Sequence, residues 1–272
     1  MTTIQLAKKQ FNPKELLLSS PKRSDYSSVI REDCIAYPEG ELPILSMKWE
    51  GLVIPTEKEL LRCFEKIKYS ESTRVGGLKT RSACLGSKPR VAIKNDYCSK
   101  AETASNYPLE HEIFLSCSRT FAHLYKQHFP DIFQNHLDCL NRKGKEIHKD
   151  YIIEGTPFTS GILNRDNALK YHRDGGNIKD TMSCMLVLKR DIVGGYLVLP
   201  EYDVAFELGN MTLFFFNGQK IIHGVTPFTK ESKQAYRYSA VFYTMEKMWE
   251  CLPIDKELRR IQEKFDRQFD EI

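Results

Sequence analysis

Apolar residues recur at helical spacing soon after the first 55 residues of the chain. A capping box begins at Thr56, with Glu59 three residues later. Leu60, Phe64 and Ile67 then fall on one face of a helix. The pattern therefore predicts a helix that begins after Thr56.

Two later stretches show the same spacing. Before Pro130, apolar residues recur at steps of four, four and three: Ile113, Cys117, Phe121 and Leu124. After Asp255, a second run comprises Leu258, Ile261, Phe265, Phe269 and Ile272. We predict a helix in each stretch, the first ending at Pro130 and the second packing its apolar stripe on the core.

The stretch between Thr156 and Tyr243 has a different pattern. Short apolar runs, rich in β-branched and aromatic residues, alternate with Gly, Asn, Asp and Pro. We predict strands at 156–163, 168–172, 181–188, 194–199, 203–208, 211–217, 220–225 and 235–243. Short, closely spaced strands are typical of a jelly roll or a barrel rather than a βαβ sheet. Periodicity alone does not distinguish the jelly roll from the barrel. The expected class is a mainly β core with flanking α-helices, α+β overall.

We predict one structural domain assembled from four segments. Residues 1–55 are expected to form an irregular segment that wraps the surface, and residues 56–150 a helical and basic-loop support region. Residues 151–245 would form the β catalytic core, and residues 246–272 a C-terminal helix. A chain of 272 residues with 41% hydrophobic residues is long enough and apolar enough to bury such a core.

The start of the chain and its cysteines bear on its compartment. No run of 18 apolar residues occurs, and Lys8, Lys9 and Gln10 stand where a secretory segment would be apolar. We expect an intracellular protein with no membrane segment, cytoplasmic in a prokaryote or phage host and nuclear in a eukaryote. The eight cysteines are scattered without a C-x-x-C pair, so we expect reduced thiols with no disulfide or zinc role.

Metal-ligand side chains alternate after one predicted strand. His172 and Asp174, two residues apart, point the same way in an extended chain. His223 lies on another predicted strand further along. Two histidines and one carboxylate form the facial triad of non-haem iron(II) oxygenases, which leaves positions open for a cosubstrate and dioxygen. We therefore predict that these three residues hold Fe(II).

A guanidinium on the last predicted strand suits a carboxylate ligand. Arg237 presents a rigid fork of donors, and Ser239 can point the same way and add a hydroxyl. We predict that this pair binds the far carboxylate of an oxoacid whose other end reaches the iron. Five other histidines lie on helical or charged segments and are assigned no chemistry: His111, His123, His128, His136 and His148.

These motifs resemble the TET and J-binding protein family of DNA-base dioxygenases, within the Fe(II)- and 2-oxoglutarate-dependent oxygenase superfamily. The likeness rests on His172-Arg173-Asp174 and on residues 194–202, 223–227 and 237–243. It implies a double-stranded β-helix or jelly roll of the cupin-like type. It also implies Fe(II), 2-oxoglutarate and dioxygen as cofactor and cosubstrates of an oxidoreductase.

The resemblance further implies a substrate. Members of the family oxidise the 5-methyl group of 5-methylcytosine or thymine in DNA to hydroxymethyl and further products. Such a base has to be flipped out of the duplex into a pocket. Asn164 is placed to contact 2-oxoglutarate, and Asn177 and Tyr243 are placed to contact the base.

The stretch from residue 74 to residue 94 is basic, with no acidic residue. Its six cations are candidates for contacts to the DNA backbone: Arg74, Lys79, Arg81, Lys88, Arg90 and Lys94. A solvated loop would have the same composition. The net charge of +4 does not by itself indicate a nucleic-acid partner.

Two other functions fit parts of the pattern. The iron residues would equally serve a hydroxylase of a protein side chain or a small metabolite. A non-catalytic nucleic-acid-binding barrel is an alternative of another class. We expect a monomer.

Overall fold

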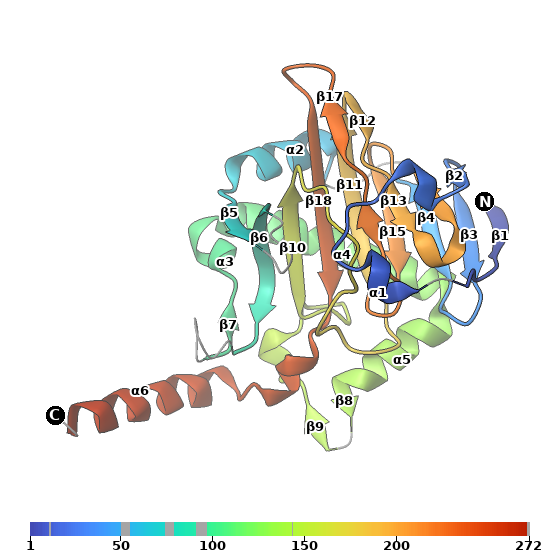
Figure 1. Cartoon of the computed structure of the whole chain (residues 1–272). Coiled ribbons are helices and arrows are strands. Elements are labelled where there is room, and N and C mark those ends of the chain that lie inside the picture. Colours follow the sequence, from blue (N-terminus) through green and yellow to red (C-terminus); the bar gives the residue numbers. More distant parts are fainter. Residues whose placement is uncertain (11, 50–54, 74–78, 91–96, 143, 271–272) are drawn as a thin grey trace. The chain divides into compact units, whose positions relative to one another are not determined.

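The computed structural model describes the chain except residues 11, 50–54, 74–78, 91–96, 143 and 271–272, and the side chains of residues 265 and 267–270 (Figure 1). It divides into two compact units. The first comprises Met1–Ala83, Ile162–Gly175 and Lys179–Val241. The second comprises Cys84–Gly161, Gly176–Ile178 and Phe242–Ile272.

The first unit carries most of a large mixed sheet. Its strands follow the order β1-β3-β4-β15-β11-β18-β10-β6-β5, and β7 also pairs with β6. Their bounds are β1 Thr2–Leu6, β3 Cys34–Pro38, β4 Ile44–Lys48, β15 Thr212–Phe216, β11 Ser183–Arg190, β18 Tyr236–Tyr243, β10 Ser160–Arg165, β6 Lys79–Lys88, β5 Ser70–Thr73 and β7 Ser99–Lys100. Strands far apart in sequence are therefore neighbours, as in a jelly roll.

A second sheet of the same unit has the order β16-β13-β14-β2. Its strands are β16 Gly224–Val225, β13 Leu197–Leu199, β14 Val204–Phe206 and β2 Ser28–Ile30. Val187 and Phe214 of the large sheet share one buried cluster with Leu199 and Phe206 of the second sheet. The apolar faces of the two sheets thus form the core, and the expected jelly-roll class with flanking helices is confirmed.

Shorter elements complete the first unit. They are α1 Pro13–Leu16, η1 Arg23–Asp25, α2 Glu57–Lys66, η3 Pro200–Tyr202, and the paired strands β12 Ile192–Gly194 and β17 Phe228–Lys230. The predicted start of α2 is confirmed. The Glu59 amide donates to Thr56 Oγ1 at 3.3 Å, and the Glu59 carboxylate accepts from the Thr56 amide at 2.8 Å.

The second unit is mainly helical. It contains α3 Glu102–Asn106, α4 Pro108–His128, α5 Pro130–Leu140, β8 Asn141–Arg142, β9 Lys145–Glu146, η2 Lys149–Tyr151, η4 Glu246–Glu250 and α6 Ile254–Asp270. Phe121 of α4 packs edge-on against Phe242, with ring centroids 5.8 Å apart. The helix predicted before Pro130 is confirmed as α4, but Pro130 also starts α5, because proline fits the first turn of a helix.

Three local expectations were wrong. The segment expected to be irregular contributes β1 to β4, whose pairing partners include the distant strands β14 and β15. Residues 168–172 form no strand, although His172 makes an isolated bridge. Leu258 of α6 is 59% exposed rather than packed on the core. Helical spacing identifies an apolar face but not what covers it, and the side chains of Phe265, Phe269 and Ile272 lie outside the described residues.

The expectation that every cysteine is reduced was also wrong. Cys98 and Cys251, 153 residues apart in sequence, form a disulfide in the second unit. Such a pair cannot be read from local cysteine spacing, because the fold brings the two residues together. None of the described helices is long and apolar enough to cross a lipid bilayer.

Candidate metal centre

His172 and His223 face each other on neighbouring antiparallel segments of the first unit. The His172 amide donates to the His223 carbonyl at 2.9 Å, and the His223 amide donates to the His172 carbonyl at 3.0 Å. The centroids of the two imidazole rings are 4.3 Å apart. Backbone pairing therefore brings the two predicted ligands together, although neither lies inside a regular strand.

Asp174 supplies the third side chain. Its Oδ1 lies 3.6 Å from His172 Nε2 and 3.8 Å from His223 Nε2. The Asp174 amide donates to the Gly218 carbonyl at 2.9 Å, which fixes the turn that aims the carboxylate. The ligand atoms of the three residues all lie within 4.8 Å of one another, so the group can hold a metal ion.

The other ring nitrogen of each histidine is already engaged. His172 Nδ1 lies 2.8 Å from the Lys170 carbonyl, and His223 Nδ1 lies 3.0 Å from the Ile221 carbonyl. A carbonyl accepts, so each Nδ1 carries the proton and each Nε2 keeps a lone pair. Burial and, to a smaller extent, the neighbouring His172 lower the pKa of His223 to about 4, against the opposing effects of Asp174 and the Ile221 carbonyl. His223 is thus neutral at physiological pH, the form that binds metals.

Arg237 on β18 is a buried cation with donor capacity to spare. Its Nη1 donates to the Asn167 carbonyl at 3.4 Å, and its Nε has no hydrogen-bond partner among the described residues. Gly195, at φ +70°, leaves room for the guanidinium, since a Cβ there would lie 3.2 Å from Arg237 Nε. Burial lowers the pKa of Arg237 to about 10 and Asp166 opposes the shift, so the group stays charged at neutral pH. A buried charge of this kind suits an anionic ligand.

Amide and hydroxyl groups lie on the same strands. Ser239 follows Arg237 on β18 and accepts a hydrogen bond at 3.2 Å from Asn164 Nδ2 on β10. Asn167 Nδ2 donates to Asn164 Oδ1 at 3.0 Å. The structure therefore brings Asn164 and Ser239 together, as the sequence predicts for a carboxylate pocket.

The remaining predicted site residues are the proposed base contacts and the proposed contacts to the DNA backbone. Asn177 and Tyr243 both belong to the second unit, where Asn177 is buried and makes a bridge with Met245. Of the predicted DNA contacts, Arg74 and Lys94 lie outside the described residues. Lys79 is exposed.

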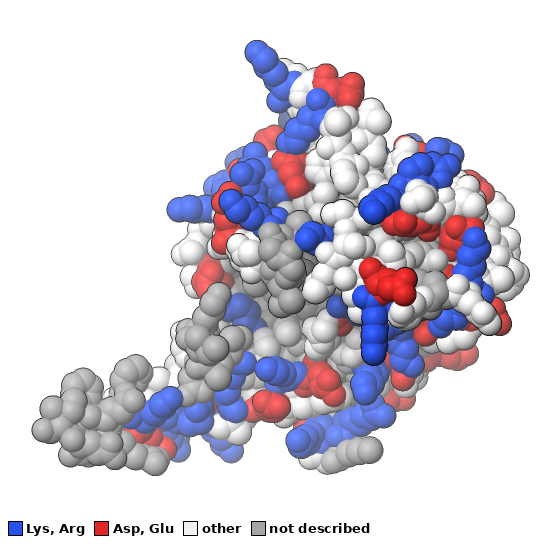
Figure 2. All heavy atoms as spheres, viewed as in Figure 1, with Lys and Arg blue, Asp and Glu red and all other residues white. Residues whose placement is uncertain are grey.

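Three predicted DNA contacts are engaged in ion pairs. Arg81 pairs with Glu71 at 2.9 Å, and Lys88 pairs with Glu102 at 2.7 Å. Arg90 pairs with the buried carboxylate of Glu257. Figure 2 shows basic side chains gathered over α2 and β5 with acidic side chains among them. The composition of the 74–94 stretch therefore overstates the free positive charge that it presents.

Sequence reasoning missed three residues that contact the site. Asn167 binds Asn164 and Arg237, Glu201 contacts both metal-ligand segments, and Gly218 lies against Asp174. Glu201 falls inside a motif shared with the family, which was a usable signal. Asn167 and Gly218 carry no local signal, because asparagine and glycine are common in turns.

Comparisons with known proteins agree with this site. The family model Tet_JBP, described as the oxygenase domain of the 2OGFeDO superfamily, matches residues 92–246 and so includes the triad and Arg237. No curated protein matches the chain. Among solved structures, NgTET1 in complex with 5mC DNA aligns with a TM-score of 0.61 at 12% identity, over 86% of each chain.

Two further solved structures align more weakly. A 2OG-Fe(II) oxygenase family oxidoreductase from Burkholderia pseudomallei aligns with a TM-score of 0.45 at 13% identity, over 74% of this chain and 85% of that one. OsALKBH1 aligns with a TM-score of 0.42 at 14% identity, over 77% and 99%. Because the family model covers more than half of the chain, this protein belongs to the TET/JBP oxygenase family and is an Fe(II)- and 2-oxoglutarate-dependent oxygenase.

Proposed function

We propose that the chain oxidises the 5-methyl group of a pyrimidine base in DNA, 5-methylcytosine or thymine, first to the 5-hydroxymethyl base. His172, Asp174 and His223 are proposed to hold Fe(II), and Arg237 to bind 2-oxoglutarate. The observation that carries the proposal is the convergence of the three ligand side chains within 4.8 Å in a TET/JBP oxygenase domain.

The donor set fits a bound iron and oxoacid. Two imidazole Nε2 atoms and one carboxylate occupy one side of a metal and leave positions for other ligands. When bound, iron and 2-oxoglutarate supply the activation of dioxygen that removes a methyl hydrogen. The protein's part is to position both groups. Arg237 would hold the far carboxylate with Nε and the rest of its fork, and Ser239 and Asn164 would add polar contacts.

The choice of a DNA base rests on the family and on the structural likeness. The solved NgTET1 structure holds 5mC DNA, and this chain shares its fold. A base stacked inside a duplex cannot bring its methyl carbon to an iron held by these three side chains, so the proposal requires base flipping. Asn177 would then hydrogen-bond the base edge and Tyr243 would contact its face. Lys79 and Arg81 are proposed as contacts to the phosphate backbone.

One observation favours the alternative, a hydroxylase of a protein side chain or small metabolite. Arg81, Lys88 and Arg90 each have an acidic partner. Phosphate binding by these cations would require the DNA to compete with those carboxylates. The iron centre is common to both functions, so only the substrate distinguishes them.

The deciding experiment supplies both candidate bases. Purified protein is incubated with Fe(II), 2-oxoglutarate and duplex DNA that contains thymine and 5-methylcytosine, and the DNA is digested to nucleosides for mass spectrometry. We expect a hydroxymethyl nucleoside from one base and none from His172→Ala. Succinate release that DNA does not stimulate, with no oxidised nucleoside, would reject the DNA substrate. Equal product from wild type and His172→Ala would reject the metal assignment.

A further inference from the structure

Glu201 is a carboxylate buried beside the candidate metal centre. It lies in η3, between β13 and β14, and is 4% exposed. A buried carboxylate is costly unless its oxygens are hydrogen-bonded or paired with cations. The identity of its partners therefore indicates what the residue does.

The two carboxylate oxygens contact both segments that supply the metal ligands. Oε2 accepts a hydrogen bond at 2.9 Å from the amide of Ile222, the residue before His223. Oε1 lies 3.5 Å from Nη2 of Arg173, the residue between His172 and Asp174.

Arg173 makes a second contact between the two ligand segments. Its Nε donates at 2.7 Å to the carbonyl of Lys220, three residues before His223. A single buried carboxylate and a single guanidinium thus tie the His172–Asp174 segment to the His223 segment. These ties add to the backbone bridge between the two histidines.

We propose that Glu201 is a positioning residue for the metal centre, acting through Ile222 and Arg173 on all three ligands. The inference rests on the assignment of His172, Asp174 and His223 as the metal ligands. Its consequence is that Glu201 sets metal affinity without touching the ion. Residues that orient metal ligands typically change metal affinity by about 10- to 100-fold when they are removed.

A second buried carboxylate provides a matched control. Glu257, 1% exposed, accepts from the Leu252 amide at 2.9 Å and pairs with Arg90. It therefore shares with Glu201 a backbone amide and an arginine as partners, while Glu201 Oε1 also lies 3.9 Å from Lys8 Nζ. Among the described residues, its partners are Leu252, Cys98, Arg90 and Arg260, and none of these is a metal-ligand residue or a sequence neighbour of one. Glu257→Ala reports what loss of a buried carboxylate does to stability alone.

The test measures metal binding rather than turnover. Metal-free wild type, Glu201→Ala, Glu201→Gln, Arg173→Met and Glu257→Ala are titrated with Co(II), and the visible ligand-field absorbance gives the Kd. The folded fraction is matched by circular dichroism. We expect Glu201→Ala to raise the Kd by about 10-fold or more. Arg173→Met and Glu201→Gln should raise it less, because each keeps the Ile222 amide bonded, and Glu257→Ala should leave it unchanged.

The outcomes separate this inference from the metal assignment. His172→Ala is the reference, and cobalt binding that it fails to abolish would reject the triad itself. If the triad holds, Kd values within about twofold of wild type for both Glu201 variants would reject the role of Glu201. An equal loss in Glu257→Ala would also reject it, since the effect would then be one of stability. If Glu201→Ala does not fold, Glu201→Gln and Arg173→Met decide by the same criterion.

Discussion

At the scale of single residues, Gly218 makes room for Asp174. Its carbonyl accepts the Asp174 amide at 2.9 Å, and a Cβ at position 218 would collide with the Asp174 carboxylate and lie 3.1 Å from the Phe216 ring. No positive φ is involved, so space alone requires glycine here.

We predict that Gly218→Ala displaces Asp174 and lowers both metal affinity and oxygenase turnover by at least about 10-fold. Cobalt titration and succinate release measure the two effects. Gly209→Ala is the matched control, because its Cβ would meet Thr212 Oγ1 at an ordinary 3.6 Å. Wild-type metal affinity in Gly218→Ala would show that Asp174 tolerates displacement or is not a ligand.

Arg237 allows a prediction that separates the cosubstrate from the metal. Removing a buried guanidinium loses two charge-assisted hydrogen bonds, each worth about 1.5–3 kcal/mol. Arg237→Ala should therefore raise the KM for 2-oxoglutarate by about two orders of magnitude or more, with cobalt affinity near that of wild type. Arg190→Ala, which removes an arginine stacked over Tyr236 at 5.1 Å, should leave that KM unchanged. An unaltered KM in Arg237→Ala would remove it from the cosubstrate site.

The proposed site residues that the sequence indicated could be found from their spacing or their order along the chain. His172 and Asp174 could be paired because alternate residues of an extended segment point the same way. His223 and Arg237 needed the order of motifs along the chain as well. Glu201 lies inside a motif shared with the family, but the contacts with Ile222 and Arg173 on which its proposed role rests are visible only in the fold.

At the scale of elements, the turn after β10 holds Arg237 in place. Asp166, at φ +53°, donates its amide to the Arg237 carbonyl at 2.8 Å, and its Oδ1 accepts the Arg237 amide at 3.1 Å. The Asn167 carbonyl accepts from the guanidinium, while the Asn167 side chain bonds the Arg81 amide at 2.9 Å and the Arg81 carbonyl at 3.1 Å. The turn therefore connects β18 to β6.

We predict that Asn167→Ala raises the KM for 2-oxoglutarate several-fold, less than Arg237→Ala, because it loosens the carbonyl that orients the guanidinium. Loss of its side-chain hydrogen bonds should also lower the free energy of unfolding by about 1–3 kcal/mol. Asn210→Ala controls for stability, since Asn210 likewise bonds a backbone amide, that of Lys189, and the Glu57 carboxylate. The same KM in both variants would mean that the turn does not orient Arg237.

Helices and strands differed in how far the sequence predicted them. The start of α2 is fixed locally by Thr56 and Glu59, so the motif sufficed. The N-terminal strands depend on partners that are remote in sequence. Ser46 of β4 pairs with Phe214, and Val29 of β2 pairs with Ala205, and these pairings leave no periodic signal in the first 55 residues.

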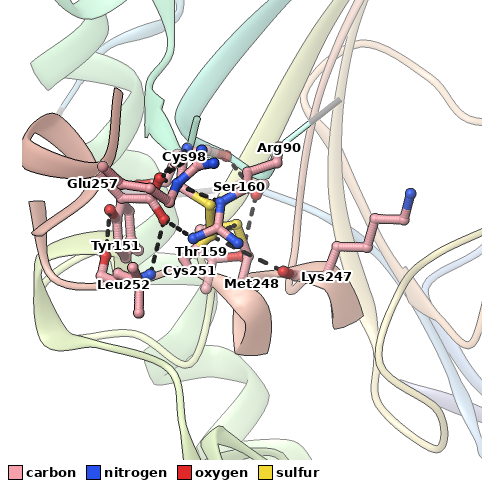
Figure 3. The surroundings of a disulfide bond; sticks show 12 residues. Arg90, Cys98, Tyr151, Thr159, Ser160, Lys247, Met248, Cys251, Leu252 and Glu257 are labelled. Atoms are coloured by element: carbon pink, nitrogen blue, oxygen red, sulfur yellow. Dashed lines mark hydrogen bonds and ion pairs between the residues drawn. A yellow bond between two sulfur atoms is a disulfide. The ribbon is translucent and has the colours of Figure 1, made fainter. Parts of the chain in front are cut away.

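At the scale of the whole molecule, the residues proposed to bind the metal and the cosubstrate all belong to the first unit. The disulfide belongs to the second unit. Figure 3 shows Cys98 and Cys251 beside the ion pair of Arg90 and Glu257. The Glu257 carboxylate also accepts from the Leu252 amide and, at 3.4 Å, from the Cys98 amide. A covalent link and a buried carboxylate therefore join the same two segments.

We predict that reduction destabilises the second unit without unfolding it. Opening a cross-link between residues 153 positions apart releases a long loop in the unfolded chain. The resulting gain in the entropy of the unfolded chain should lower the free energy of unfolding by about 2–5 kcal/mol. Urea unfolding with and without dithiothreitol measures the difference. The double variant Cys98→Ser with Cys251→Ser should have the urea midpoint of the reduced wild type, and dithiothreitol should not change it. Because Glu257 still holds Leu252 and Cys98 after reduction, Glu257→Ala should enlarge the effect of dithiothreitol. Equal urea midpoints for oxidised and reduced wild type would mean that the disulfide does not stabilise this unit.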